Sequence, residues 1–296
     1  MHNGQLPQSR RLRETRRASS LREGAYKEET PQSAALRETA AASSPLQGSL
    51  QGSFIEMNET KLTFKRTEKK YLLTSEQYDA LWEGMAPYLE PDEYPRSTVC
   101  SIYYDTDDYR LIRHSLDAPV YKEKLRLRSY NVPGEQDPVF VELKKKFKGV
   151  VYKRRVCLPA RRAAAWLNGE SPPGEDGQMI REIDWFLRSV QPRAKVYLAC
   201  DRYAWRAKDD PELRITFDRD LRWRETELDL CAGDRGEPLL PEGQVLMEIK
   251  TPAAAPLWLA HLLSELKIFP VSFSKYGTCY KEHILNEYIF GGSTHA

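Results

Sequence analysis

The chain has 296 residues, of which 41% are hydrophobic and 30% charged, and its formal net charge is +2. Of its 45 basic and 43 acidic residues, 8 and 6 lie in residues 1–56, which leaves 37 of each sign in the remainder. A neutral domain is a poor candidate for broad electrostatic capture of nucleic acid or of an anionic membrane. Any basic chemistry must therefore be concentrated locally.

Several site classes lack support in the sequence. The five cysteines are scattered without a CxxC pair, which argues against zinc and is typical of a reduced, cytoplasmic protein. No GxxxxGK[ST] motif occurs, so a P-loop kinase is excluded. No apolar run reaches the roughly 18 residues that a membrane span needs, and no apolar signal segment opens the chain.

Residues 1–56 are rich in Ser, Ala, Gln and Arg, and the tetrapeptide LQGS at 46–49 is repeated at 50–53. Such a segment buries too little apolar area to offset the entropy of ordering, so we expect it to be disordered. Met57 directly precedes the region with regular patterning and is a candidate natural start. We expect residues 57–296 to form one domain.

Short alternating runs bounded by Pro, Gly, Asn or Asp indicate strands. They predict strands near 64–73, 97–104, 121–131, 138–147, 150–158, 194–206, 212–219 and 244–251. Helices fit 75–88, with Ser75 as the N-cap, and 159–168, 177–190, 254–267 and 275–289. We expect an α+β fold: an eight-stranded antiparallel β-barrel with helices packed outside, whose interior holds one narrow ligand.

Charged residues alternate with apolar ones in these strands, and residues at i and i+2 share a face. The run 121–131 places Lys122, Lys124, Arg126 and Arg128 on one face, opposite Leu125 and Leu127. One interpretation is a solvated outer face with cross-strand ion pairs. Because the pattern recurs in seven strands with an excess of basic residues, we favour an inward-facing charged lumen.

A chain of phosphates fits such a lumen, since Arg and Lys are its usual partners. The interspersed carboxylates Glu68, Glu142 and Glu248 would repel phosphate oxygens unless Mg²⁺ or Mn²⁺ bridges them. The residues thus predict a phosphate-binding tunnel that also uses a divalent metal.

Nine short motifs follow one another along the predicted strands and the last helix. They are RTEKKY at 66–71, SIYYDT at 101–106, KLRLR at 124–128, VELKK at 141–145, VYKRR at 151–155, DRY at 201–203, RITFD at 214–218, EIK at 248–250 and SKY at 274–276. In this order they resemble the VTC (vacuolar transporter chaperone) domain, the polyphosphate polymerase branch of the triphosphate tunnel metalloenzymes. No single motif is specific, but nine in the family's order are a strong signal, and the resemblance covers about 61–288.

The resemblance implies an eight-stranded tunnel that transfers the terminal phosphoryl group of ATP onto a growing inorganic polyphosphate, with Mn²⁺ or Mg²⁺. Matched residue by residue, it implies roles in phosphate binding and catalysis for Lys70, Arg126, Arg128, Lys144, Arg202, Arg214 and Lys275. The charged faces add further phosphate contacts at Lys124, Lys146, Lys153, Arg155 and Lys250. Glu248 matches the family's metal-binding carboxylate, and we expect Glu68 to assist it.

The sequence also departs from the wider superfamily. Arg66 stands where an ExExK motif would begin the first strand, which leaves fewer metal ligands and favours the VTC pattern. Without a membrane segment of its own, the chain would need a separate membrane partner to couple synthesis to export, and would lie peripherally at the inner face.

Three other functions stay open at this point. Water could replace the polyphosphate acceptor, giving a metal-dependent triphosphatase or polyphosphatase. The chain could instead be a non-catalytic polyphosphate-binding subunit. A nucleic-acid binder is the weakest interpretation, because the basic residues lack interleaved exposed aromatics.

Overall fold

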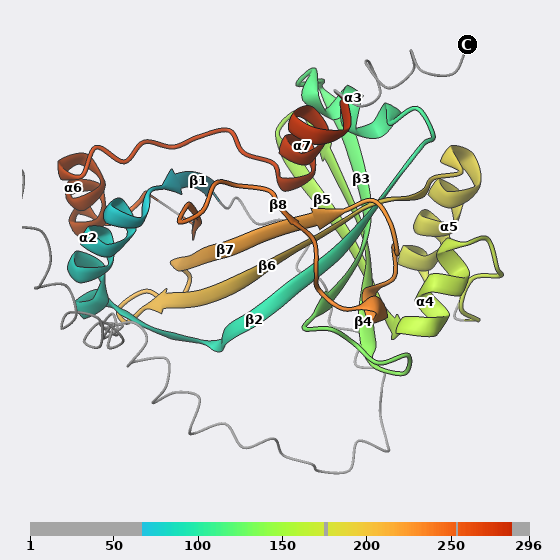
Figure 1. Ribbon diagram of the computed structural model, residues 1–296, viewed down its shortest axis with the longest axis horizontal. Coiled ribbons are helices and arrows are strands. Elements are labelled where there is room, and N and C mark those ends of the chain that lie inside the picture. The colour runs from blue at the N-terminus through green and yellow to red at the C-terminus, as the bar shows by residue number, and fades with distance from the viewer. Residues whose placement is uncertain (1–66, 175–176, 253, 286–296) are drawn as a thin grey trace, which may run out of the picture. The chain divides into compact units, whose positions relative to one another are not determined.

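The computed structural model describes residues 67–174, 177–252 and 254–285 (Figure 1). The segment 1–56, which we expected to be disordered, lies outside these residues. So do residues 64–66 of the first expected strand and 286–289 of the last expected helix. Among the described residues, no helix is long and apolar enough to cross a membrane.

All strand pairs are antiparallel, and the sheet order is β1-β9-β7-β6-β2-β3-β4-β5, with β8 paired to β7. The bounds are β1 Thr67–Leu73, β2 Leu89–Asp105, β3 Tyr121–Tyr130, β4 Pro138–Phe147, β5 Val150–Pro159, β6 Arg193–Ala207, β7 Arg214–Arg224, β8 Glu237–Pro238 and β9 Val245–Thr251.

The expected closed, eight-stranded barrel is wrong, because this sheet has nine strands and is open between β1 and β5. The free edge of β1 meets a different segment: the Val271 amide donates to the Lys70 carbonyl at 2.7 Å. That bridge takes up part of the edge to which β5 would have to bond to close the sheet.

The sequence patterns missed β8, the 3₁₀ turn Leu230–Ala232, the first part of β2 and one helix. β2 begins at Leu89 rather than near 97, and its register with β6 shifts between Pro91 and Arg96. The first part of β2 was not predicted because prolines are uncommon inside strands. The helix α3 (Arg110–Leu116) was not expected. It is organised by a residue outside it, the buried Asp105, whose carboxylate accepts from the amides of Leu111 and Ile112 at 2.8 and 2.9 Å.

The N-cap of helix α2 (Ser75–Met85) lies one residue before the expected position. Its N-cap is Thr74, not Ser75, and Thr74 forms a reciprocal capping box with Gln77. A 3₁₀ turn, Ala86–Tyr88, continues α2 to the end of the expected range. The other helices are α4 Ala160–Leu167, α5 Gln178–Val190, α6 Leu257–Glu265 and α7 Lys275–Cys279, which a π turn at Tyr280–Ile284 extends; a second 3₁₀ turn is Leu230–Ala232.

Helices α2, α4 and α5 cover the apolar face of the sheet. α4 and α5 bring Trp166, Ile183 and Phe186 against the buried side chains of β3 and β4 (Figure 1). α2 packs Trp82 against Trp205 and Phe217, with the Trp82 and Trp205 ring centroids 4.7 Å apart. The opposite face of the sheet is its concave face.

Part of that opposite face is filled by α7. The Tyr276 ring stacks on Tyr103 at 4.8 Å, and Cys279, Tyr280 and Leu198 join the same buried cluster. This apolar packing occupies one portion of the inner face, and charged side chains occupy the rest.

Candidate phosphate-binding site

The strand register places the charged side chains on one face, because directly opposite residues of antiparallel strands point the same way. Lys124 lies opposite Lys144, and Arg126 lies opposite Glu142. We call this set the charged face; it comprises Glu68, Lys70, Lys122, Lys124, Arg126, Arg128, Glu142, Lys144, Lys146, Lys153, Arg155, Arg202, Arg214, Asp218, Glu248 and Lys250.

The charged face is concave although the sheet is open. Lys70 from β1 donates to the Phe273 carbonyl at 3.1 Å, and Lys124 from β3 donates to the adjacent Ser274 hydroxyl at 3.1 Å. The charges of Glu68 and Lys70 on β1 also act on the pKa of Lys144 on β4, which Glu68 raises and Lys70 lowers. Strands that are distant in the sheet order therefore bring their charges to a common space.

Glu142 is the centre of one cation cluster. Its side chain is 1% exposed and contacts Arg126 at 2.6 Å, Lys153 at 2.8 Å and Arg155, whose Nε donates at 2.6 Å. Burial alone would raise the pKa of Glu142, but these cations and Arg128 outweigh it and hold that pKa well below its usual range. One carboxylate thus holds three cations in place and leaves a net positive charge.

Asp218 is the centre of a second cluster and is fully buried. Arg202 forms a bidentate ion pair with Asp218, in which its Nε and Nη2 donate at 2.6 and 2.8 Å. Lys275 at the start of α7 contacts the same carboxylate. Burial opposes ionisation, but Lys275 and Arg202 hold the pKa of Asp218 well below its usual range. Lys275 therefore reaches the charged face from a helix 57 residues further along the chain.

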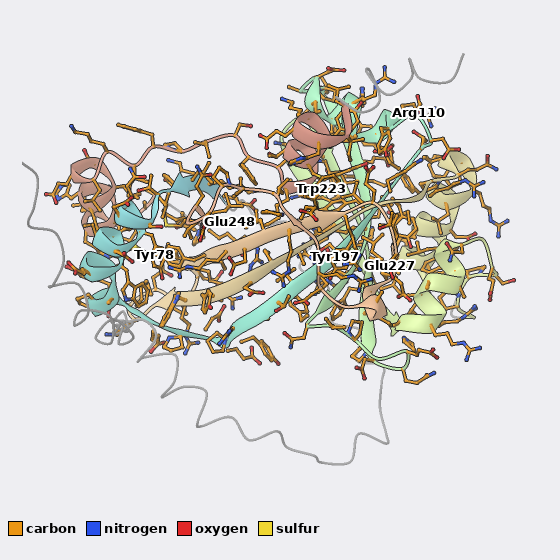
Figure 2. All side chains as sticks on the ribbon, in the orientation of Figure 1. Tyr78, Arg110, Tyr197, Trp223, Glu227 and Glu248 are labelled. Atoms are coloured by element: carbon orange, nitrogen blue, oxygen red, sulfur yellow. The ribbon has the colours of Figure 1, made fainter. Side chains whose placement is uncertain are left out.

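Glu248 lies on β9 between β1 and β7 (Figure 2). Its carboxylate contacts Lys250 at 3.2 Å, and Lys70, which lies directly opposite Glu248 on β1, is 3.7 Å from Glu68. Burial raises the pKa of Glu248, but Lys250 and Lys70 outweigh it, so the net shift is downward and the carboxylate stays ionised.

A divalent metal fits this carboxylate pair. Across the described parts of the chain, no group of three or more His, Cys, Asp or Glu side chains converges. Glu248 and Glu68 nevertheless supply adjacent hard oxygen ligands, and Mg²⁺ is commonly held by one or two carboxylates together with substrate phosphates and water. The donor set therefore suits a metal that binds together with a phosphate ligand.

Several cations of the charged face have no acidic partner. Lys124, Lys144 and Arg128 form no ion pair within the described residues, and Arg128 donates only to the Ser101 hydroxyl, at 3.2 Å. Burial, together with Lys122, Lys144 and Lys70, lowers the pKa of Lys124 to about 8, although the nearby Tyr103 acts to raise it. The pKa values of Lys144 and Arg128 are likewise lowered, first by burial. These cations repel one another in the absence of an anion.

Two expected site residues lie at the margins of the charged face. Arg214 is half-exposed at the start of β7 and lies 3.7 Å from Asp92. Lys146 is exposed near the end of β4. The other expected residues belong to the concave part described above, where Lys144 and Lys153 are also exposed to solvent.

The sequence patterns missed three contributors. Asp218 was not expected as a site residue, and Glu142 was expected only as a carboxylate bridged to phosphate by a metal, whereas it is paired with Arg126, Lys153 and Arg155. Tyr103 lies in an apolar-looking run, but Arg126 donates to its hydroxyl at 3.3 Å. Burial raises the pKa of Tyr103, and Arg126 and Arg128 outweigh it and bring the pKa to about 8. The i+2 spacing of Ser101 and Tyr103 on a strand beside a basic strand was the available signal.

Known structures with a similar arrangement are distant in sequence. A Bacillus halodurans protein described as an adenylate cyclase is 16% identical, with a TM-score of 0.45, and the match covers 70% of this chain and 92% of that one. A Hippeastrum protein described as an adenylyl cyclase with a dominant triphosphatase activity is 14% identical, with a TM-score of 0.42 and coverage of 73% and 94%. A Pyrococcus horikoshii protein is 14% identical, with a TM-score of 0.38 and coverage of 74% and 99%.

No curated protein matches the chain. The VTC domain family, in contrast, matches residues 65–284, which include every strand and nearly all of the described residues. The resemblance inferred from the strand motifs is thereby confirmed. The chain belongs to the VTC domain family.

Proposed function

We propose that the chain is a polyphosphate polymerase, which transfers the terminal phosphoryl group of ATP onto inorganic polyphosphate with the help of Mn²⁺ or Mg²⁺. Membership of the VTC family supports a function on triphosphate or polyphosphate. The observation that carries the proposal is the set of cations without acidic partners, Lys124, Lys144 and Arg128, on a concave face. An extended polyanion relieves their mutual repulsion.

The extent of the cation row favours a ligand longer than a nucleotide triphosphate. On β3 alone, alternate residues from Lys122 to Arg128 carry a positive charge. Six residues of strand span about 20 Å. Three phosphates occupy only part of such a row, so the remainder supports binding of an acceptor chain.

The proposed reaction needs no covalent enzyme intermediate. A terminal oxygen of the acceptor chain forms a bond to the γ-phosphorus of ATP, the bond from that phosphorus to the β–γ bridging oxygen breaks, and ADP leaves with the electron pair. Phosphoryl transfer has a loose transition state, so positioning and charge neutralisation supply most of the catalysis.

The clusters described above assign the roles. In the proposal, Arg126 and Arg202 are fixed by Glu142 and Asp218, so their orientation is set before phosphate arrives. The groups that contact the reacting phosphates are Lys70, Arg126, Arg128, Lys144, Arg202, Arg214 and Lys275, and those that hold the remaining phosphates are Lys124, Lys146, Lys153, Arg155 and Lys250. A divalent metal held by Glu248 and Glu68 would neutralise phosphate oxygens.

The test is incubation of the full chain with ATP and Mn²⁺, followed by gel analysis of the products. We expect a ladder of polyphosphate chains that Lys144→Met abolishes, whereas Lys69→Met, on the exposed start of β1, leaves it intact. Release of free phosphate without a ladder would favour the triphosphatase. Tight polyphosphate binding without any turnover would favour the non-catalytic subunit.

A further inference from the structure

The tip at which β3 begins and β4 turns into β5 presents contiguous apolar side chains to solvent. Val120, Tyr121, Phe147 and Val150 have exposed fractions between 42% and 62%. The register places Tyr121 opposite Phe147, and Phe147 opposite Val150. We call these four residues, with the neighbouring lysines 122, 146 and 148, the tip surface. Contiguous exposed apolar groups mark an interaction surface more often than scattered ones do.

The tip surface is held together by its backbone. Lys148 and Gly149 form a two-residue turn with φ of 46° and 85°, the left-handed values that such hairpins require and that glycine adopts without strain. The Lys148 amide donates to the Val120 carbonyl at 3.0 Å, which joins the hairpin to the start of β3. The apolar side chains are therefore displayed together on a fixed frame.

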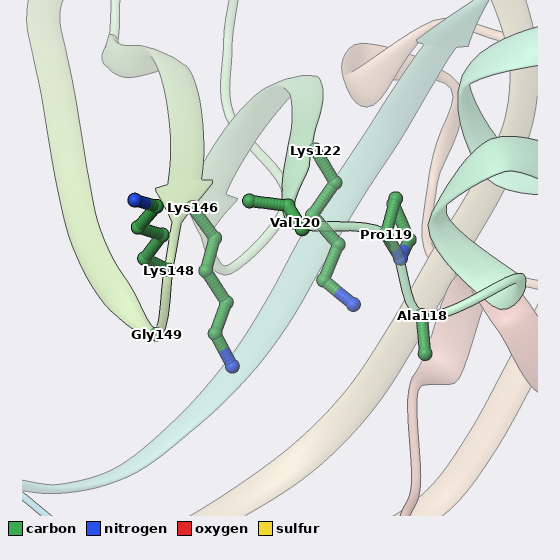
Figure 3. A pocket seen from close by; sticks show the side chains of 7 residues that line it. All are labelled: Ala118, Pro119, Val120, Lys122, Lys146, Lys148 and Gly149. Atoms are coloured by element: carbon green, nitrogen blue, oxygen red, sulfur yellow. The ribbon is translucent and has the colours of Figure 1, made fainter.

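The tip surface is also basic. Lys122, Lys146 and Lys148 line a pocket of roughly 330 Å³ together with Ala118, Pro119, Val120 and Gly149 (Figure 3). None of the three lysines forms an ion pair with any residue that the structure describes. The nearby Glu123 is engaged by Tyr121 and Lys145, and Asp117 is the exposed acidic neighbour. Positive charge thus predominates at the tip, with Lys122 and Lys146 on the side of the hairpin opposite Tyr121, Phe147 and Val150.

We propose that the tip surface docks on an anionic lipid bilayer. Apolar side chains on one side of the hairpin tip and lysines on the other match the boundary between acyl chains and anionic headgroups, where each kind of side chain meets its complement. A free phosphate chain would use the lysines but gain nothing from Val120, Phe147 and Val150. An acidic protein partner would use the lysines as well, but the apolar side chains project from a hairpin tip and form no central anchor pocket for it.

Docking there would also orient the charged face. β3 and β4 run from the tip surface directly into the row that contains Lys124 and Lys144. One end of that row would then open at the lipid surface. The docking inference itself rests only on the tip and does not require the proposed polymerase activity.

The test is co-sedimentation of the full chain with vesicles of phosphatidylcholine alone, or of phosphatidylcholine mixed with phosphatidylserine. We expect binding to the anionic vesicles that declines with salt. Lys148→Gln should weaken it about fivefold, and Val120→Ser with Phe147→Ser about tenfold or more. Matched controls at two more exposed apolar sites, Leu257→Ser with Phe269→Ser, should bind as the wild type does.

Each outcome decides the proposal. Unchanged thermal melting and ATP turnover in solution would show that the tip variants fold, because none of their residues belongs to the charged face. Absence of vesicle binding, or binding that survives Val120→Ser with Phe147→Ser, would overturn the inference. So would lipid-free dimers that these variants dissociate, since a second copy would then occupy the tip.

Discussion

Lys124 on β3 lies directly opposite Lys144 on β4, and neither side chain pairs with a carboxylate of the described residues. Like charges that face each other across a sheet destabilise it. The fold retains this arrangement while it neutralises neighbouring cations through Glu142 and Asp218. The uncompensated charge is therefore confined to a few positions, and these are where we expect phosphate oxygens to bind.

The first prediction concerns the pH dependence of polyphosphate binding. The pKa of Lys124 is lowered to about 8, so its positive charge is present below that pH and is lost as the pH rises through it. The phenol of Tyr103, with a pKa also near 8, becomes negative over the same range. Polyphosphate affinity should therefore fall between about pH 7 and pH 9. Fluorescence titration would measure it, with Lys124→Met and Tyr103→Phe each reducing the slope; a flat profile for the wild type would contradict the assignment.

The second prediction is that Lys124→Met stabilises the ligand-free protein. A buried ammonium with a lowered pKa is less stable in the folded chain than in the unfolded one at neutral pH. An apolar side chain of similar length should add about 1 kcal/mol to the free energy of unfolding. Thermal melts without phosphate at pH 7 would detect the gain, and the difference from wild type should shrink as the pH rises above 8. A lower melting temperature at pH 7 would count against the account.

The third prediction concerns Glu142. Glu142→Gln leaves Arg126, Lys153 and Arg155 without their shared carboxylate, and should cost about 2–3 kcal/mol, because two of these cations are partly exposed. Added tripolyphosphate should restore more stability to this variant than to the wild type, since it supplies the missing negative charge. Chemical denaturation with and without tripolyphosphate would measure both effects, with the exposed Glu242→Gln as the control.

Glu142 also makes stability depend on acidity. Its folded pKa lies below the unfolded value of about 4.3, so its contribution is present above that pH and is lost as the pH falls further. Glu142→Gln should therefore lose less stability than the wild type when the pH falls below about 4. An equal acid loss in both proteins would show that Glu142 is not the group responsible.

The fourth prediction separates metal from phosphate. Glu248→Gln should lower ATP turnover by about 100-fold and weaken Mn²⁺ binding, measured by electron paramagnetic resonance, while polyphosphate still binds the basic residues. Glu68→Gln should have the same effect in weaker form, and the exposed Glu83→Gln should have none. Full turnover in Glu248→Gln would mean that the metal, if used, is held elsewhere.

Local alternation in the sequence was sufficient to predict the charged face. Residues two apart on a strand share a side whatever the rest of the fold does, so Lys124, Arg126 and Arg128 could be grouped from their spacing alone. Closure of the sheet could not be predicted in the same way. It depends on which segment bonds to the edge of β1, and Val271, two hundred residues later, takes part of that edge.

The organising carboxylates were missed for a similar reason. Alternation with Arg214 and Thr216 sets the side of the strand on which Asp218 lies, but nothing near it in the sequence indicates that Arg202 and Lys275 converge on it. Glu142 was noticed as an interspersed acid, but its role depends on the register that sets it between Arg126 and Arg155. Contacts set by pairing and curvature require the three-dimensional arrangement.

The most direct measurement is a crystal structure of the protein with tripolyphosphate bound. The account predicts phosphate oxygens within hydrogen-bonding distance of Lys124, Lys144 and Arg128, on the concave side of the sheet. Tripolyphosphate bound only on the helix-covered side, or a concave face that stays free of phosphate at saturating ligand, would contradict it.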